Sequence, residues 1–186
     1  MIFDAHAHLF SREFYSGLFE QKNGHRPTDD DIERMADAAG LRMPPDDPVV
    51  LAQTWVEQMD LHDIDKMVLF TSLPGEQTEV AKAVAVFPDR LVGYTMANPR
   101  LPDALEIARR DISELGLSGI ELFPSMHRFG PADERITYPV YELASELGVP
   151  VFSHVGIMRV PLREKLGLPS FFDMTLSDPS LLHRPA

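Results

Sequence analysis

The sequence predicts an α/β fold with a parallel sheet, either closed as a barrel or open and doubly wound. From Asp65 onward, short apolar runs alternate with amphipathic segments of helical period. The tetrapeptide SELG also occurs twice, at Ser113–Gly116 and at Ser145–Gly148, each time between a helical segment and an apolar run. The repeating unit is therefore a strand followed by a helix. No Gly-x-Gly occurs, so a dinucleotide fingerprint and a P-loop are both absent.

Five apolar stretches are predicted to form the strands. They are short and rich in Val, Ile, Leu and Phe, which is typical of strands buried on both faces. They cover residues 2–9, 66–72, 90–99, 118–125 and 150–156.

Three helices are predicted between the strands, at Pro48–Leu61, Pro102–Leu115 and Pro139–Leu147. The second and third have Pro near the start and Gly just past the end, as helices often do. Each has an apolar face, which in the first comprises Leu51, Trp55 and Met59, with Trp55 assigned to the core.

Residues 10–47 interrupt the rhythm of strands and helices. They contain several Gly and Pro residues around one predicted helix, TDDDIERMADAAG, with Thr28 as its N-cap. We expect a loop-plus-helix insertion that lies over the C-terminal end of the first strand. Residues 157–186 show no further apolar strand, so we expect an irregular segment there. The whole chain, residues 1–186, is expected to form one domain.

Composition narrows the function classes. The chain has 186 residues, 44% hydrophobic and 25% charged, as in ordinary globular proteins. A net charge of -12 with scattered basic residues argues against a nucleic-acid partner. Neither an apolar run of about 20 residues nor a signal peptide is present, so we expect no membrane association and a cytoplasmic location. Because the chain has no cysteine, any metal must be held by His and carboxylate groups.

Polar side chains gather at the predicted carboxyl ends of the strands, where parallel barrels place their active sites. Asp4, His6 and His8 alternate along the first strand and are therefore predicted to share one face. Thr71 and Ser72, Asn98, Glu121 and His154 end the other four strands in turn. Three neutral imidazoles with an open position for water are typical of catalytic zinc sites.

These motifs resemble the amidohydrolase superfamily. The resemblance rests on three motifs: the N-terminal D-x-H-x-H, the sequence GIELFP in the fourth predicted strand and the sequence VFSHVG in the fifth. The nearest branch includes aminocarboxymuconate semialdehyde decarboxylase and related metal-dependent hydrolases. The resemblance implies a distorted, TIM-like (β/α)8 barrel that binds zinc or a similar divalent ion through His6, His8 and His154. It also implies a catalytic or ligand role for Glu121, at a position where many relatives have Lys, Gln or Glu.

The chain departs from this family at its C-terminal end. Members also use a His at the end of strand six and an Asp at the end of strand eight, whereas this sequence stops at Ala186. His183 is a poor substitute, because its SLLHRPA context is not a strand. A complete barrel needs about 250 residues. We therefore expect only about the first five β/α units, in a chain that is C-terminally truncated, inactive alone or completed by a partner.

The substrate is expected to be small and to carry a carboxylate. Arg100, Arg128 and Arg159 each follow a strand end by a few residues, and arginine binds carboxylates in a bidentate way. With Asn98 they are the predicted substrate-binding residues, although solvated loop arginines are the alternative. Of the remaining histidines, His25, His62 and His127 are expected at the surface, with His127 the one favoured to line a pocket.

The predicted reaction is hydrolysis by a metal-activated water, with metal-dependent decarboxylation on the same scaffold as the alternative. The predicted ion is Zn²⁺, with Mn²⁺ as the alternative. A homo-oligomer is also expected, because an incomplete barrel exposes strand edges.

Overall fold

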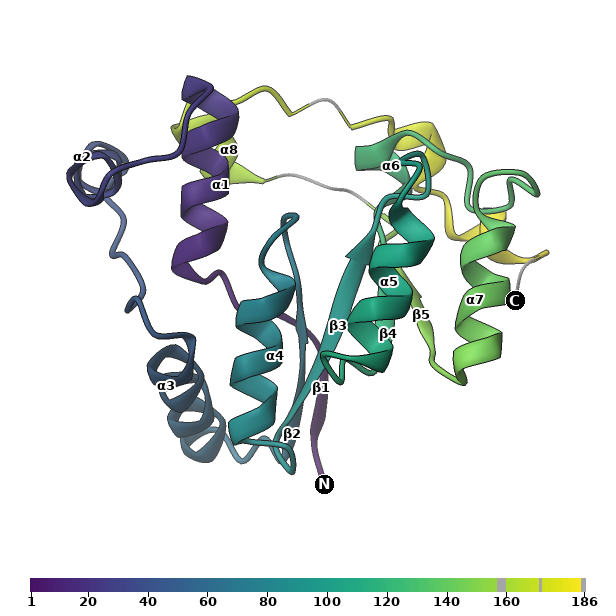
Figure 1. Cartoon of the computed structure of the whole chain (residues 1–186), viewed down its shortest axis with the longest axis horizontal. Coiled ribbons are helices and arrows are strands. Elements are labelled where there is room, and N and C mark those ends of the chain that lie inside the picture. The colour runs from purple at the N-terminus through teal and green to yellow at the C-terminus, as the bar shows by residue number, and fades with distance from the viewer. Residues whose placement is uncertain (157–159, 171, 185–186) are drawn as a thin grey trace. The chain divides into compact units, whose positions relative to one another are not determined.

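The computed structural model describes residues 1–156, 160–170 and 172–184. Its five strands form one sheet in the order β1-β2-β3-β4-β5 (Figure 1). Pairing is parallel between β1 and β2, β3 and β4, and β4 and β5. The strands are β1 (Phe3–His8), β2 (Lys66–Phe70), β3 (Leu91–Ala97), β4 (Gly119–Leu122) and β5 (Val151–Ser153). Each lies inside a predicted strand, so the parallel α/β prediction is confirmed.

Helices follow and precede these strands along the chain. They are α1 (Arg12–Asn23), α2 (Asp29–Ala39), α3 (Pro48–Leu61), α4 (Gln77–Val86), α5 (Ala104–Ser113), α6 (Pro124–His127), α7 (Tyr138–Leu147) and α8 (Pro161–Lys165), with short 3₁₀ turns η1 (Met174–Leu176) and η2 (Pro179–Leu182). Among the described residues, no helix combines the length and the apolar composition that a membrane crossing needs.

The chain divides into two compact units. The first comprises Met1–Gly93 and Pro161–Pro169, and the second comprises Tyr94–Val160 and Ser170–Ala186. The boundary falls inside β3. A single domain over residues 1–186 stays a prediction, and each unit is described by itself below.

In the first unit, β1 pairs with the buried strand β2 through an irregular register. Asp4 lies opposite Met67 and Ala7 lies opposite Leu69, so β1 has one extra residue between these pairs. Such a bulge bends the strand and changes where its side chains point.

Helix α3 has the predicted bounds but a different buried face. Ala52, Val56 and Met59 are buried, whereas Leu51 and Trp55 are only partly so. The assignment of Trp55 to the core was therefore wrong. The buried stripe contains Pro48, Ala52, Val56 and Met59, so Leu51 and Trp55, each one position before a buried residue, lie at its edge.

The insertion after β1 contains two helices, so the prediction of one helix in residues 10–47 was wrong. The missed helix is α1, which is capped by Ser11 and buries Phe14 and Leu18. These two side chains pack against Leu166 and Leu168, about 150 positions along the numbering, in a small core of their own. Helix α2 is the predicted one, and Thr28 caps it in a capping box with Asp31.

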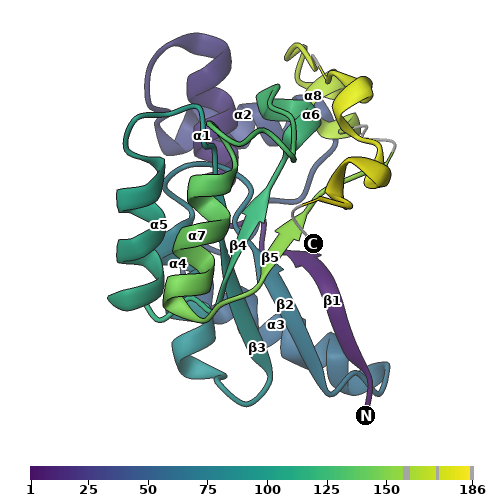
Figure 2. The same cartoon turned by 90° about the vertical axis from the view of Figure 1, so that its right-hand side faces the viewer.

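In the second unit, β4 and β5 lie beside α5 and α7, and these two helices pack against each other (Figure 2). Their core contains Ile120 and Leu122 from β4 and Val140 from α7. The two glycines of the SELG repeats, Gly116 and Gly148, have φ of 73° and 67°, a left-handed conformation that glycine adopts at little cost. Gly148 is the C-cap of α7, whereas α5 ends earlier, with Glu114 as its C-cap, so the repeat does not end the two helices in the same way.

The segment after β5 is irregular, as predicted. Residues 160–170 and 172–184 contain α8 and the two 3₁₀ turns but no strand. Gly156 and Ser177 tie the segment to the end of β5, because the Gly156 N–H donates to the Ser177 carbonyl at 2.8 Å.

Candidate functional site

The end of β1 brings together two of the predicted metal ligands. The Nε2 atoms of His6 and His8 lie 3.2 Å apart. Asp4, which the alternation predicts on the same face, accepts a hydrogen bond from the His6 N–H at 3.0 Å through Oδ1. The Asp4 carboxylate is thus bonded to the backbone of the bulge. In the first unit, the candidate centre therefore consists of the imidazoles of His6 and His8.

The spacing of these imidazoles fits a shared divalent ion. Zinc binds imidazole nitrogen at about 2.0–2.1 Å in tetrahedral geometry, which separates two ligand nitrogens by about 3.3 Å. The 3.2 Å between the two Nε2 atoms matches this value. A single N–H···N hydrogen bond between neutral rings has a similar length, so the geometry suits both the loaded and the metal-free pair.

Both rings are held by their surroundings. Ser72 Oγ, after β2, lies 2.8 Å from Nδ1 of His8. Phe10 stacks on His8 with ring centroids 5.1 Å apart and planes 9° from parallel, from a backbone with φ of 48°. The ring of His6 meets Phe70 edge-on, also at 5.1 Å.

The surroundings of His6 favour the neutral form of its imidazole, the form that metals bind. Burial lowers the pKa of His6, and the negative charge of Asp4 opposes this effect only in part. An imidazole that is neutral near pH 7 has a lone pair on one of its two ring nitrogens, and this lone pair can bind a metal ion.

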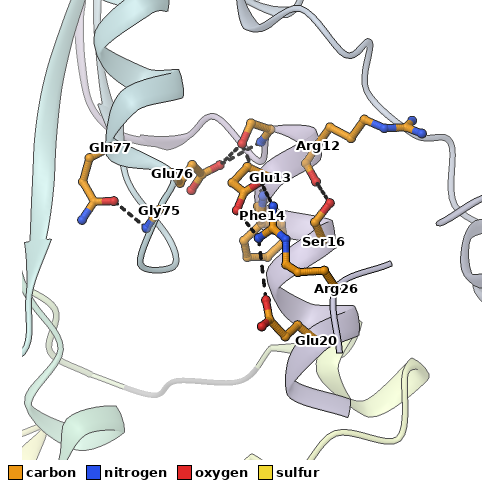
Figure 3. Close-up of polar contacts among 10 residues, drawn as sticks. Arg12, Glu13, Phe14, Ser16, Glu20, Arg26, Gly75, Glu76 and Gln77 are labelled. Atoms are coloured by element: carbon orange, nitrogen blue, oxygen red, sulfur yellow. Dashed lines mark hydrogen bonds and ion pairs between the residues drawn. The ribbon is translucent and has the colours of Figure 1, made fainter. Parts of the chain in front are cut away.

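Glu76, at the start of α4, is a buried residue that the sequence analysis missed; Figure 3 shows its side chain near the start of α1. It has no exposed surface, and its carboxylate accepts hydrogen bonds from Ser11 and from the Ser72 N–H. In the sequence it stands in the polar stretch SLPGEQ, which is typical of a solvated loop. Its partner Ser11 lies 65 positions away, so no local pattern could reveal the bonds.

The second unit carries the other two predicted centre residues. Glu121 is fully buried on β4, opposite Met96 on one side and Phe152 on the other. His154 directly follows β5, and its ring stacks on Phe123 at 5.1 Å with an interplanar angle of 20°. Both therefore occupy carboxyl ends of neighbouring parallel strands, as predicted from the sequence.

The predicted substrate-binding residues of the second unit lie on connected loops. Asn98 accepts a hydrogen bond from the Arg100 N–H at 3.2 Å and so shapes the turn after β3. The Arg100 guanidinium donates to the carbonyl of Arg128 at 2.8 Å, and Arg128 has φ of 57°. Their role in substrate binding stays a prediction. Arg159 lies outside the described residues.

His127 is partly buried, so the expectation that it lies at the surface was wrong. It ends α6, and its ring lies 6.0 Å from Phe123 and 6.5 Å from Phe129. Its Nδ1 is buried and has no hydrogen-bond partner among the described residues. Burial lowers its pKa to about 4. His25 and His62 are exposed, as predicted.

Solved structures share this fold at low sequence identity. A 5-carboxyvanillate decarboxylase from Novosphingobium aromaticivorans, complexed with manganese and a nitrobenzoic acid, matches with a TM-score of 0.58 and 19% identity over 98% of this chain. The 5-carboxyvanillate decarboxylase from Sphingomonas paucimobilis matches with a TM-score of 0.57 and 17% identity over 96% of this chain. An uncharacterized TIM-barrel protein from Bordetella bronchiseptica matches with a TM-score of 0.59 and 17% identity over 98% of this chain. The five strands are thus part of a TIM-type barrel.

These structures are longer than this chain, which covers 58%, 57% and 61% of them respectively. Among curated proteins, no match was found. A family model of amidohydrolases matches residues 3–183, nearly the whole sequence. The chain therefore belongs to the amidohydrolase family.

Proposed function

We propose that this chain carries the first five β/α units of a metal-dependent enzyme of the amidohydrolase type. The observation that supports this most is the 3.2 Å spacing of the two Nε2 atoms at the end of β1. When bound there, a divalent ion would supply Lewis acidity, either lowering the pKa of a water toward about 7 or polarising the substrate. Zn²⁺ is the proposed ion, and Mn²⁺ is the alternative because a similar structure contains manganese.

The proposed ligands are His6, His8 and His154. Each lies at the carboxyl end of a parallel strand, where barrels of this type place their functional groups. Glu121 is proposed as the catalytic carboxylate that accepts or returns a proton during the reaction. It is fully buried at the carboxyl end of β4, among the strand ends where barrels of this type place their functional groups.

The proposed substrate is a small molecule with a carboxylate group. Arg100 and Arg128 lie close together on the loops after β3 and β4, where their positive charge would attract an anion. Arg159 and Asn98 complete the proposed set. We also retain a homo-oligomer as a proposal, because β1 and β5 are the edge strands of the sheet.

Decarboxylation is the second candidate function. Two of the similar solved structures are 5-carboxyvanillate decarboxylases, and this favours a carboxylated substrate on the same scaffold. This chain covers less than two thirds of the length of these enzymes, so the activity of a whole enzyme is only proposed for it.

Metal binding tests the proposal first. Calorimetric titration with Zn²⁺ and with Mn²⁺ should show one site per chain, weakened at least tenfold in His6→Asn and in His8→Asn. His62→Asn, at an exposed position after α3, is the matched control and should bind like the parent protein. Equal affinity in all four proteins would contradict the proposed centre. Two activity assays then separate the two reactions. Proton release from ester or amide substrates would indicate hydrolysis, and CO₂ release from aromatic acids would indicate decarboxylation.

A further inference from the structure

A small cavity in the first unit lies among helices α1, α2 and α8 (Figure 1). Its volume is about 210 Å³, and none of its lining residues belongs to the candidate centre at the end of β1. Pockets that hold drug-sized ligands have volumes of about 300–1,000 Å³. The size of this cavity therefore limits its occupant to a small molecule.

The packing of α8 against α1 places two lysines on this cavity. The Arg163 guanidinium donates to the side-chain oxygen of Gln21 at 2.9 Å, although 142 positions separate the two residues. Leu166, directly after α8, is buried in the small core that α1 also builds. Lys22 in the last turn of α1 and Lys165 at the end of α8 thus line the same cavity through tertiary contacts.

Positive charge predominates among the charged residues that line the cavity. Lys22, Arg34 and Lys165 are basic, and Asp31 is acidic. The Asp31 carboxylate accepts hydrogen bonds from the Thr28 N–H at 2.9 Å and from Arg34 at 2.5 Å. The bonds from Thr28, and after them the bond from Arg34, lower the pKa of Asp31 to about 2. Asp31 and Arg34 neutralise each other, and the charge of the two lysines remains.

These two lysines have no ion-pair partner in the part of the chain that the structure describes. The whole chain has four lysines and a net charge of -12, so half of its lysines line one small cavity of an acidic protein. Lys82, by contrast, pairs with Glu79 at 2.9 Å. Two cations without a protein partner at one opening attract an anion.

The rest of the lining determines what kind of anion fits. Phe19, Met35 and Ala39 are partly buried and Leu166 is buried, so the walls of the cavity are largely apolar. Apolar walls with a few charged groups are typical of sites for small organic molecules. An inorganic anion would leave these walls in contact with water, whereas a ligand with an apolar body would cover them.

We propose that this cavity binds a small organic carboxylate. The apolar body of the ligand contacts Phe19, Met35 and Leu166, and its carboxylate lies at the opening with Lys22 and Lys165. The site needs no metal ion and is separate from the proposed reaction at the end of β1, so neither proposal depends on the other.

The test uses benzoate as the probe and the metal-free full chain. A ¹H–¹⁵N NMR titration gives both the affinity and the place of binding. Benzoate should shift the amide signals of Ala39 and Leu166 with a dissociation constant of about 0.1–10 mM, as expected for so small a ligand. Benzamide has a similar shape but no charge, so it should bind more weakly than benzoate, and only the binding of benzoate should weaken as salt is added.

Substitution of the lysines tests the charge. Lys22→Gln and Lys165→Gln should each weaken the binding of benzoate about two- to fivefold, the effect of losing one exposed charge pair. The double variant should weaken it about four- to twenty-five-fold if the two effects add. Lys82→Gln is the matched control, because it changes the net charge equally but lies outside the cavity, and it should bind benzoate like the parent protein.

Filling the cavity tests the place of binding. Ala38 is exposed on α2 and lines the cavity, so Ala38→Phe should leave the fold intact and weaken the binding of benzoate at least tenfold. Equal affinity for benzoate and benzamide, or equal benzoate affinity in the parent and the double lysine variant, would overturn the proposal. Shifts confined to amides around His8 and Ser72 would also overturn it, and would leave the proposed function standing.

Discussion

The buried imidazole of His127 should make the stability of the protein depend on pH in a defined window. Burial lowers its pKa from 6.5 to about 4. Between these two values the unfolded chain binds a proton on His127 and the folded protein does not, so stability falls as the pH is lowered. Each pKa unit corresponds to about 1.36 kcal/mol, which makes the full loss about 3 kcal/mol.

The variant His127→Phe isolates this contribution. Phenylalanine keeps a ring between Phe123 and Phe129 but cannot take up a proton, and every other titrating group is common to both proteins. Urea unfolding followed by circular dichroism at several pH values gives the free energy of unfolding of each. The parent should lose about 3 kcal/mol relative to the variant between pH 7.5 and pH 4. A difference that stays constant over this range would refute the buried, neutral state of His127.

Four single substitutions, one double substitution and the removal of bound metal test other parts of the structure. Gly119→Ala should cost about 1–3 kcal/mol of unfolding free energy, because a Cβ there would lie 2.4 Å from the ring of Tyr94, and the additional change Tyr94→Ala should remove most of this cost. Asp111→Ala should lower the free energy of unfolding by about 2–4 kcal/mol, and Thr95→Val should lower it by about 1 kcal/mol. The reason is that the buried Asp111 carboxylate accepts a hydrogen bond from the Thr95 hydroxyl at 2.6 Å. Thr28→Ala should cost about 1 kcal/mol by opening the capping box of α2. When free Zn²⁺ is present at about a hundred times its dissociation constant, the bound ion should stabilise the protein by about 2.7 kcal/mol. Adding a chelator should remove this stabilisation, which is measured as a fall in melting temperature.

The strands and the closing of the helices could be predicted because their signals are local. Short apolar runs bury both faces of a parallel strand, and Gly148 takes the left-handed conformation that ends α7. His6 and His8 were found for the same reason, since two imidazoles on one strand are visible without knowledge of any other segment.

The features that the sequence analysis missed depend on distant partners. Helix α1 has Gly17 in its interior and buries only Phe14 and Leu18, against side chains near residue 166. Glu76 looks like a loop residue until Ser11 is seen to donate to it. The role of Asp4 depends on the bulge in β1, which is set by pairing with β2. Tertiary contacts overrode the local pattern in all three cases.

The central claim, that His6 and His8 bind one divalent ion through Nε2, is tested most directly by X-ray absorption at the zinc edge. With one equivalent of Zn²⁺, the parent chain should show imidazole nitrogens at about 2.0–2.1 Å. The variants His6→Asn and His8→Asn should each show one imidazole fewer. A spectrum without imidazole scattering, or with the same imidazole count in all three proteins, would contradict the account.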